Sequence, residues 1–396
     1  MGPPVMNGDA ADNQPVPLPR PARRPDIDWV RALAVLLLVP FHASLIFQAP
    51  GAYHITSGDR TPFLGYAAGF VSQWHMPLLF ALAGMATWFA LQFRSPGQYA
   101  KERLKRLLVP LVFGTLVIVP PQMYYQRLSE GRFQGSYLSF YPHFFDGVYP
   151  QGNLTYNHLW FILYLVVFSM LSLPVLVWLN GQAGRRFTAK LAAFCERRGA
   201  IFLFAVPVAV TESLFRARWG GLQTLISDWA NFTQYLYLFI LGFVICSEER
   251  FWRAIERHGL AALVCGVATT TIGIAWYASD TDPRPDYSPA WTLLMVLRAF
   301  NAWFWMIALL SAGKRYLSFS NGLLPYVREG SYPFYVLHQT VLIGIGYYVM
   351  SWQIGVMPRF LTVVIATTIA TTAIYDVLVR RTNATRFLFG MKPRKA

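Results

Sequence analysis

The sequence predicts an all-α polytopic protein that crosses a membrane about ten times. Of its 396 residues, 55% are hydrophobic and only 13% are charged, whereas an ordinary soluble domain carries about 25% charged residues. Apolar segments long enough to cross about 30 Å of hydrocarbon recur along the chain, and the mean hydropathy is +0.37. The charged residues lie in short segments between these apolar ones, so the net charge of +15 indicates contact with a lipid bilayer rather than with nucleic acid.

Ten segments have the length and apolarity of transmembrane helices, and the fifth is the weakest because Glu212 and Arg216 interrupt it. In chain order they are 29–48, 66–93, 104–125, 157–180, 200–216, 230–247, 259–278, 289–311, 331–352 and 357–380. The Pro-rich segment 1–27 is polar and is predicted to be a disordered tail, with the first helix as an uncleaved anchor. A transmembrane domain is predicted over 28–382, and a basic tail over 383–396.

Lysine and arginine residues outside these helices are unevenly distributed between the two sides of the membrane. Most fall in the N-terminal tail, in the even-numbered loops and after the last helix. The positive-inside rule therefore predicts that both termini are cytoplasmic.

Arg31 and His42 lie inside the first predicted helix, where such side chains are costly unless they are paired or functional. The eleven steps between them correspond to about 16 Å along a helix axis. Eleven rotations of about 100° return to nearly the same direction, so both side chains leave one face. The spacing predicts a permanent cation near one membrane surface and a titratable base near mid-depth. Asp28 shares this face and is expected to pair with Arg31 or to lie at the interface.

Five further polar residues lie in or at the ends of predicted helices, and each has a structural as well as a functional interpretation. His75 precedes a proline and could bond a free backbone carbonyl, whereas His158 begins an aromatic segment typical of the membrane interface. Arg298 is the deepest permanent cation and requires an anion, a carbonyl or a ligand. His338 lies well inside the ninth helix. Asp376 is the expected counter-ion of Arg298 or His338.

Arg103 and Arg106 are three residues apart at the predicted cytoplasmic start of the third helix, so they point the same way. They are expected to contact either lipid phosphates or the phosphates of a bound donor, because arginine binds phosphate oxygens in bidentate fashion. No Cys/His cluster has the spacing of a zinc site, and the chain has neither a P-loop nor a GxGxxG motif. A permanently bound metal or cofactor is therefore not predicted.

With an Arg-x10-His motif in the first of ten helices, the chain resembles the membrane-bound acyltransferase-3 family. Several segments look more narrowly like its glucan-biosynthesis protein C branch. These segments are Asp28-Trp29-Val30-Arg31 through Pro40-Phe41-His42, His75-Met76-Pro77-Leu78-Leu79-Phe80 with Ala83-Gly84, Arg103 through Arg106 ahead of Pro110, Pro120-Pro121-Gln122, His158-Leu159-Trp160-Phe161, Ser331-Tyr332-Pro333-Phe334-Tyr335-Val336-Leu337-His338, and Phe387-Leu388-Phe389-Gly390-Met391-Lys392-Pro393. The resemblance covers nearly the whole chain beyond residue 25.

The resemblance implies an enzyme of a bacterial inner membrane that transfers an acyl group, other than an amino-acyl group, from cytoplasmic acyl-CoA to a sugar hydroxyl on the far side. In that branch the acyl group is typically succinyl and the acceptor a periplasmic glucan, with glucan-synthesis proteins as further partners. Arg31, Arg103 and Arg106 would then meet the CoA phosphates, and His42 would act as general base. Arg298 could stabilise the oxyanion or hold a succinyl carboxylate.

His75 and His158 are the remaining candidates for binding the acceptor sugar, and His338, deeper in the membrane, is a further candidate for the substrate site. Two other functions stay open at this stage. The first keeps the chemistry but uses acetyl-CoA and acylates lipopolysaccharide or another surface glycan. The second is a proton-coupled transporter in which His42, Arg298, His338 and Asp376 form a relay.

Overall fold

The computed structural model describes residues 23–51, 53–221, 223–279, 281 and 283–394. These residues form helices joined by loops, and their β-structure is limited to two isolated bridges, Gln48 with Thr61 and Val148 with Leu154. The all-α class predicted from the sequence is therefore confirmed.

Most helices follow one another with short connections, and the longer ones lie between α2 and α3, between α5 and α7, and between α10 and α11. In chain order they are α1 (Pro25–Leu36), α2 (Leu38–Phe47), α3 (Pro62–Leu91), α4 (Pro96–Phe113), η1 (Gly114–Ile118), α5 (Pro120–Ser129), α6 (Tyr137–Phe140), η2 (Tyr141–Phe145), η3 (Asn157–Leu159), α7 (Trp160–Leu171), α8 (Leu173–Asn180), α9 (Gln182–Cys195), η4 (Ala200–Phe204), α10 (Ala205–Phe215), α11 (Trp229–Ser247), α12 (Glu249–Ala278), α13 (Pro289–Tyr316), α14 (Leu323–Val349), α15 (Val356–Ile374), η5 (Tyr375–Val379) and α16 (Asn383–Leu388).

Seven helical segments among the described residues are long and apolar enough to cross a membrane. They are Pro25–Phe47, Pro62–Leu91, Pro96–Ser129, Trp229–Ser247, Glu249–Ala278, Pro289–Tyr316 and Val356–Val379. An eighth is obtained if Asn157–Leu171 and Leu173–Asn180, which bend by 54°, form one span. The two other predicted spans are not among these eight. The fifth falls on the shorter apolar helix Ala200–Phe215, and the ninth falls on α14, which is long but carries His338 and Gln339. The count of ten stays a prediction.

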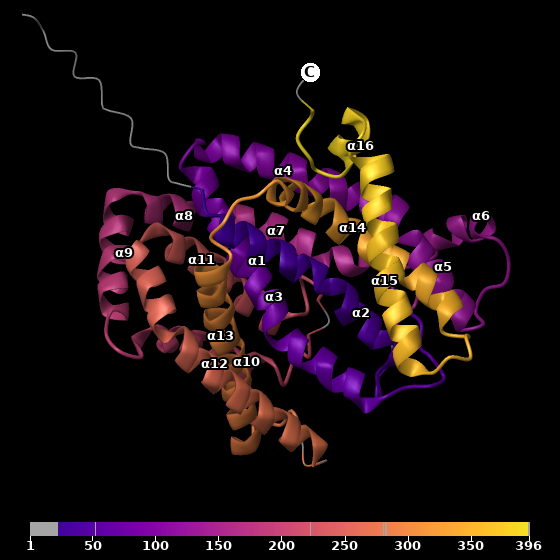
Figure 1. Cartoon of the computed structure of the whole chain (residues 1–396), viewed down its shortest axis with the longest axis horizontal. Helices are drawn as coiled ribbons and strands as arrows, with labels where there is room; N and C mark the ends of the chain where they lie inside the picture. Colours follow the sequence, from indigo (N-terminus) through magenta and orange to yellow (C-terminus); the bar gives the residue numbers. More distant parts are fainter. Residues whose placement is uncertain (1–22, 52, 222, 280, 282, 395–396) are drawn as a thin grey trace, which may run out of the picture.

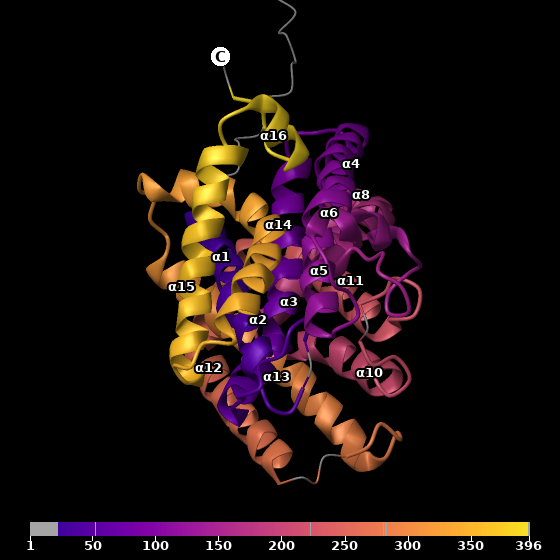
Figure 2. The same cartoon turned by 90° about the vertical axis from the view of Figure 1, so that its right-hand side faces the viewer.

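The helices form one bundle in which segments distant in sequence lie side by side. α3 packs along α11, α12 along α13, and α14 against both α15 and α1, so α1 and α2 run through the interior (Figure 1). Figure 2 shows α16 and the C-terminal end at one end of the bundle, and the α12–α13 hairpin at the opposite end. The two ends of the bundle are called the α16 end and the α12–α13 end below.

α3 and α11 approach so closely that glycine is required at two facing positions. A Cβ atom on Gly84 would lie 1.8 Å from the carbonyl oxygen of Phe239, and one on Gly242 would lie 2.0 Å from that of Ala81. Small residues allow the backbones of membrane helices to approach in this way. The contact therefore holds α3, which carries His75, firmly against α11.

Proline divides the first span into α1 and α2 at Leu37. Pro40 has no N–H to donate to the carbonyl of Leu36, and its ring clashes with that carbonyl. The chain nevertheless stays helical at Leu37, whose φ and ψ are −62° and −18° and whose N–H bonds the Leu33 carbonyl. The two helices therefore still cross as one span.

A pair of prolines at 120 and 121 follows a distorted turn in the third span and places Gln122 in the interior. The distorted turn is the π-helix η1, a structure that often occurs at functional sites. It leaves backbone carbonyls free, and that of Ile118 accepts a hydrogen bond of 2.6 Å from the Thr340 hydroxyl of α14. The distortion thus joins η1 to α14.

The transmembrane domain begins earlier than predicted. α1 starts at Pro25, and the side chain of Asp26 is buried and paired with Arg24 at 2.6 Å. Residues 24–27 therefore belong to the bundle rather than to the predicted tail 1–27, of which residues 1–22 lie outside the described residues.

Part of the predicted basic tail 383–396 is helical and packs on the bundle. α16 contacts α4, and its Arg386 is buried and hydrogen-bonded to Glu329 of α14. Gly390, with a φ of +65°, packs against the backbone of Arg106, where a Cβ atom would lie 2.5 Å from the Arg106 carbonyl oxygen. The C-terminal segment thus covers the α16 end of the bundle.

Candidate active site

Four histidines from separate parts of the chain meet inside the bundle. His42 lies on α2, His75 on α3, His158 in η3 and His338 on α14. The ring centroids of His42 and His338 are 5.3 Å apart, and those of His158 and His338 are 5.4 Å apart. The Phe41 ring links His75 to His42, with its centroid 5.0 Å from that of His42 and 6.2 Å from that of His75. The tertiary structure therefore gathers all four predicted histidines in one cluster.

Hydrogen bonds divide these histidines into two pairs. Nε2 of His75 bonds a backbone carbonyl of α1 at 2.6 Å, and Nε2 of His158 bonds a backbone carbonyl of α14 at 3.0 Å. Because a carbonyl only accepts, each of these nitrogens carries a proton. In contrast, no described residue bonds Nε2 of His42 or of His338. His158 is bonded through both ring nitrogens, since its Nδ1 accepts from Gln122, whereas His75, His42 and His338 each keep one ring nitrogen without a partner among the described residues.

His42 is oriented on one side and faces a cavity on the other. The Tyr53 hydroxyl lies 3.1 Å from Nδ1 of His42, and the two rings are stacked with centroids 5.9 Å apart. A cavity of about 330 Å³, here called the histidine cavity, is lined by His42 together with His75, His158 and Arg298. Its volume lies within the range of small-molecule sites. A reactant in this cavity would contact His42 and a cation together.

His338 does not line this cavity and is a buried group with one ring nitrogen that has no partner among the described residues. Its side chain is fully buried, and Nδ1 lies 2.6 Å from the Tyr335 carbonyl, so Nδ1 donates and Nε2 is the unprotonated nitrogen. Buried polar atoms without a partner are uncommon and call for a functional or chemical explanation.

Three amide side chains from different segments hold His158 in place. Gln122 donates to Nδ1 of His158 at 3.2 Å and to Thr340 at 2.6 Å. The carbonyl oxygen of Gln122 accepts from Asn157 at 2.7 Å and from Gln339 at 3.2 Å. Asn157 has a φ of +45°, a left-handed conformation that asparagine adopts more readily than most residues. The network fixes the inner wall of the histidine cavity.

The loop between α2 and α3 contributes Tyr53 and His54 to the same cavity. His54 lies between two amide oxygens, 2.6 Å from that of Gln126 and 3.0 Å from that of Asn157. Burial lowers the pKa of His54, and these hydrogen bonds oppose the shift only partly. Burial also raises the pKa of Tyr53 well above its usual value, so the phenol next to His42 keeps its proton at neutral pH.

Glu212 of α10 is the anionic partner of Arg298. Its carboxylate is fully buried, lies 3.6 Å from Nε of Arg298 and accepts two hydrogen bonds from Arg216, at 2.6 and 3.0 Å. Arg216 also donates to Asn231 at 2.7 Å. Arg216 therefore satisfies most of the carboxylate, and Arg298, whose side chain is 39% exposed, keeps donors free for a ligand.

The predicted role of Asp376 as counter-ion is wrong. Its carboxylate accepts a hydrogen bond of 2.9 Å from Tyr326 and lies 3.5 Å from Arg380, at the α16 end of the bundle. Arg298 of α13 instead pairs with Glu212 of α10, because α10 packs directly on α13.

Replacing Glu212 by alanine is expected to lower the free energy of unfolding by about 3–5 kcal/mol, because it leaves Arg216 buried without an anion. Thermal or denaturant unfolding of the protein in detergent micelles measures the change. The matched control is Glu196→Ala, since the ion pair between Glu196 and Arg253 is exposed and is expected to contribute less than about 1 kcal/mol. Equal losses in the two variants would contradict the prediction.

Comparison with known proteins identifies the chain. A family model described as "Acyltransferase domain" matches residues 24–376. The chain belongs to the acyltransferase-3 family. It is therefore an acyltransferase, and its series of apolar helices makes it a multi-pass membrane protein. The family resemblance noted in the sequence is confirmed.

Relatives with a curated name include the proteins called "Glucans biosynthesis protein C" of Salmonella heidelberg (strain SL476) and Salmonella enteritidis PT4 (strain P125109). Each is 24% identical to this chain over 383 residues, an alignment that covers 93% of this chain and 94% of the relative. No solved structure gives a significant match.

The predicted donor-side residues lie apart from the histidines of this acyltransferase. Arg31 pairs with Asp28, which is one of the two arrangements expected for Asp28. Asp28 also lies 3.7 Å from Arg328 of α14. Arg103 lies 3.4 Å from the Tyr99 and Thr87 hydroxyls. None of these residues lines the histidine cavity.

Arg106 is held by the C-terminal segment rather than standing free at the membrane surface. Its Nε donates to the Gly390 carbonyl at 2.9 Å, and its Nη1 lies 3.4 Å from Glu102. The nearby Tyr332 of α14 has a buried hydroxyl without a partner among the described residues. Arg106 is thus partly occupied by the protein itself.

A small apolar cavity of about 210 Å³ lies between α1, α14 and α15. On α1 it is lined by Ala32, Val35 and Leu36, which fall between Arg31 and His42 in the sequence. On α14 it is lined by residues from 326 to 334, which precede His338. This cavity, called the α1–α14 cavity, therefore lies between the Arg31 level and the His42 level.

Several residues of the site escaped the sequence analysis. Tyr53 and His54 lie in a loop, where no periodicity marks them, and Asn157 is an ordinary polar residue at a helix start. Gln122 was part of a noted Pro-Pro-Gln segment, and Glu212 was noted only as an interruption of a span. The four-residue spacing of Glu212 and Arg216, which favours an ion pair on one helix face, was the signal that could have identified the latter pair.

Among the residues that the structure describes, no group of three or more His, Cys, Asp and Glu side chains is arranged to hold a metal ion. The histidines are instead bonded to carbonyls, amides and a tyrosine.

Proposed function

We propose that this acyltransferase moves an acyl group from cytoplasmic acyl-CoA to a hydroxyl group of a periplasmic glucan, across ten spans of a bacterial inner membrane with both termini in the cytoplasm. The glucan acceptor is favoured by the names of the relatives. Succinyl is the first acyl group to test, because the chain resembles the glucan branch of the family. The topology is supported by the distribution of Lys and Arg.

His42 is the proposed general base. Its Nε2 would take the proton of the sugar hydroxyl as the hydroxyl oxygen attacks the thioester carbonyl, while Tyr53 holds the ring through Nδ1. The tetrahedral intermediate then collapses, the C–S bond breaks, and the proton passes from His42 to the sulfur of the departing CoA. The products are a sugar ester and free CoA.

Arg298 is the proposed stabiliser of negative charge. It lines the same cavity as His42 and has donors that Glu212 does not use. These donors would bind the oxyanion of the intermediate or the second carboxylate of a succinyl group. A single displaced donor of this kind commonly costs several kcal/mol of transition-state stabilisation.

The donor is proposed to enter from the α16 end. Arg31, with Asp28 beside it, would bind a CoA phosphate there, and Arg103 and Arg106 are further candidates for the same task. The α1–α14 cavity is small and mostly apolar and would hold part of the pantetheine arm. Its lining residues follow Arg31 on α1 and precede His338 on α14.

Of the four clustered histidines, His42 is the one that lines the cavity, keeps Nε2 without a partner among the described residues and has its other ring nitrogen oriented by a side-chain hydroxyl, that of Tyr53. This combination is the observation that supports His42 as the base. His75 and His158, the two predicted acceptor-side residues, donate from Nε2 to backbone carbonyls and are better suited to hold the cavity wall.

An acylation assay on the purified protein in lipid nanodiscs tests the proposal. The protein is incubated with succinyl-CoA or acetyl-CoA and a β-glucan, and both CoA release and the mass of the glucan are measured. The expected result is stoichiometric CoA release with a mass increase of one acyl group per event. If lipopolysaccharide is acylated and the glucan is not, the proposed acceptor is wrong and lipopolysaccharide takes its place. If no CoA is released with any donor and acceptor, the acyl-CoA mechanism is refuted.

A further inference from the structure

A second cavity, of about 450 Å³, adjoins the histidine cavity at the α12–α13 end of the bundle. It is called the outer cavity here. Helix ends surround it: Gln48 follows α2, Pro62 begins α3, Tyr277 is near the end of α12, and Leu294 is near the start of α13. The outer cavity therefore lies at the end opposite α16, where the proposed acceptor would arrive (Figure 2).

The two cavities share part of their walls. Phe41, Leu45, Ser72 and Arg298 line both of them. Arg298 thus lies between the space next to His42 and the outer cavity, and a ligand longer than one small ring could occupy both.

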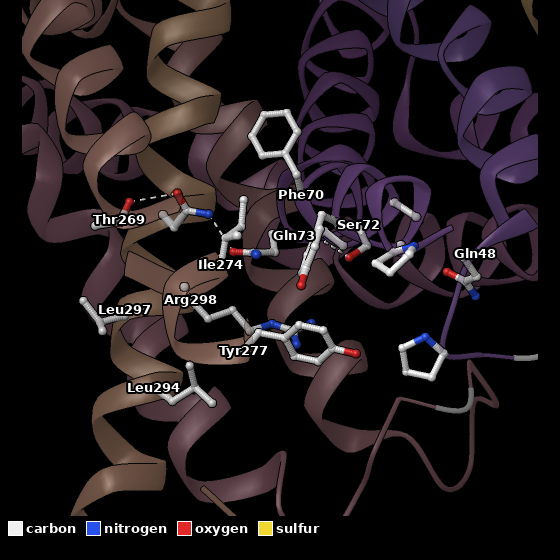
Figure 3. A pocket seen from close by; sticks show the side chains of 18 of the residues that line it. Gln48, Phe70, Ser72, Gln73, Thr269, Ile274, Tyr277, Leu294, Leu297 and Arg298 are labelled. Carbon is white, nitrogen blue, oxygen red and sulfur yellow. Dashed lines mark hydrogen bonds between the residues drawn. The ribbon is translucent and has the colours of Figure 1, made fainter. Parts of the chain in front are cut away.

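The outer cavity has polar groups fixed on its inner wall. Asn301 is buried, donates to Gln73 at 2.6 Å and accepts from Thr269 at 2.8 Å. This leaves the amide nitrogen of Gln73 without a partner among the described residues. Figure 3 shows Gln73, Ser72, Tyr277 and Arg298 around one space. Amide, hydroxyl and guanidinium groups are therefore available to a ligand on that wall.

Aromatic rings form other walls of the outer cavity. Tyr66 and Tyr277 meet edge to face at its rim, with ring centroids 6.0 Å apart, and Tyr277 is 47% exposed. Phe70 is held by the edge-to-face contact of its ring with that of Trp305, at 4.9 Å. These rings offer apolar surface next to fixed hydrogen-bonding groups.

This combination fits a sugar better than a lipid chain. Sugar hydroxyl groups can bond the amides of Gln48 and Gln73, while the apolar C–H face of the ring packs on an aromatic side chain. A lipid chain would leave those amides and Arg298 desolvated without partners, which is costly.

We propose that the outer cavity is an acceptor subsite that binds the sugar next to the one that is acylated. Resting on the proposed function, this inference says how the glucan is recognised: two of its linked sugars bind at once, so a monosaccharide is a poor acceptor. One sugar presents its hydroxyl to His42, and its neighbour lies between Gln73 and Tyr277.

Initial rates of acyl transfer to glucose, a β-linked gluco-disaccharide and a β-linked gluco-tetrasaccharide test the subsite. The wild-type protein is expected to show a kcat/KM about tenfold or more higher for the disaccharide than for glucose, the gain from one or two net hydrogen bonds. Tyr277→Ala and Gln73→Leu should each remove most of this gain, mainly through KM, and leave the rate with glucose within about twofold. Tyr316→Ala removes an exposed tyrosine at the C-terminal end of α13, away from the α12–α13 loop; it is the matched control and should keep the gain.

Direct binding separates failure of the subsite from failure of the proposed function. Tetrasaccharide binding to the catalytically inactivated His42→Ala protein in nanodiscs is measured by calorimetry, with and without Tyr277→Ala. Binding that Tyr277→Ala weakens about tenfold supports the subsite even if no acyl transfer occurs. Equal rates with glucose and the disaccharide in an active enzyme overturn it, as does a lipid that co-purifies in the outer cavity and blocks tetrasaccharide binding.

Discussion

The His42→Ala variant is expected to lose acyl transfer by about 10²–10⁴-fold in kcat, the usual contribution of a general acid–base group. The loss should fall on kcat rather than on KM, because His42 acts on the reacting hydroxyl and the donor is bound elsewhere. Single-turnover measurement of CoA release from the purified variant in nanodiscs, with glucan as acceptor, gives the rate of the chemical step.

Two controls make this result specific. His143→Ala removes an exposed loop histidine that pairs with Asp146 and should leave the rate within about twofold, since surface substitutions have small effects. His338→Ala should reduce the rate less than His42→Ala, because His338 does not line the histidine cavity. If His338→Ala is fully inactive while His42→Ala stays active, the general base is His338 of α14 rather than His42.

The Gly84→Leu variant is expected to lose roughly 3 kcal/mol or more of stability, at or above the usual cost of overpacking. The reason is that a Cβ atom there would lie 1.8 Å from the Phe239 carbonyl oxygen of α11, and a backbone atom cannot move aside as a side chain can. The melting temperature and the yield of monodisperse protein in detergent report the loss.

Gly69→Ala is the matched control for that substitution. Gly69 is in the same helix, but a Cβ atom there would meet nothing within 4 Å. The alanine variant should therefore be as stable as the wild type or more stable by up to about 1 kcal/mol, because alanine has the higher helix propensity. If Gly84→Leu melts like Gly69→Ala, α3 and α11 do not approach as closely as described.

Much of the fold was predictable because lipid imposes one-dimensional constraints on the sequence. Helices that cross a membrane must be apolar over about twenty residues, so eight of the ten predicted segments coincide with helices or bent pairs of membrane length. The helix ends were less predictable, since Pro25 and Pro62 begin helices several residues before the predicted starts. Proline at a first helical position lacks only an N–H that would stay unpaired there.

Part of the site was also predictable, because a polar group in a membrane helix needs a reason. His42, His75, His158 and His338 were selected on this basis, and all four lie in one cluster. The partner of Arg298 was not predictable in the same way. Asp376 and Glu212 are both acids in apolar segments, and only the packing of α10 on α13 selects Glu212.

The all-α membrane acyltransferase class and the polar side chains inside its helices could be inferred from the sequence alone. Which of those side chains are already bonded within the protein became clear only from the packing of the helices. Backbone carbonyls of α1 and α14 bond Nε2 of His75 and of His158, and Arg216 bonds both oxygens of Glu212, whereas Nε2 of His42 and the donors of Arg298 stay available in a shared cavity. A hydrogen bond depends on neighbours in space, and most neighbours of these residues lie far away in the chain.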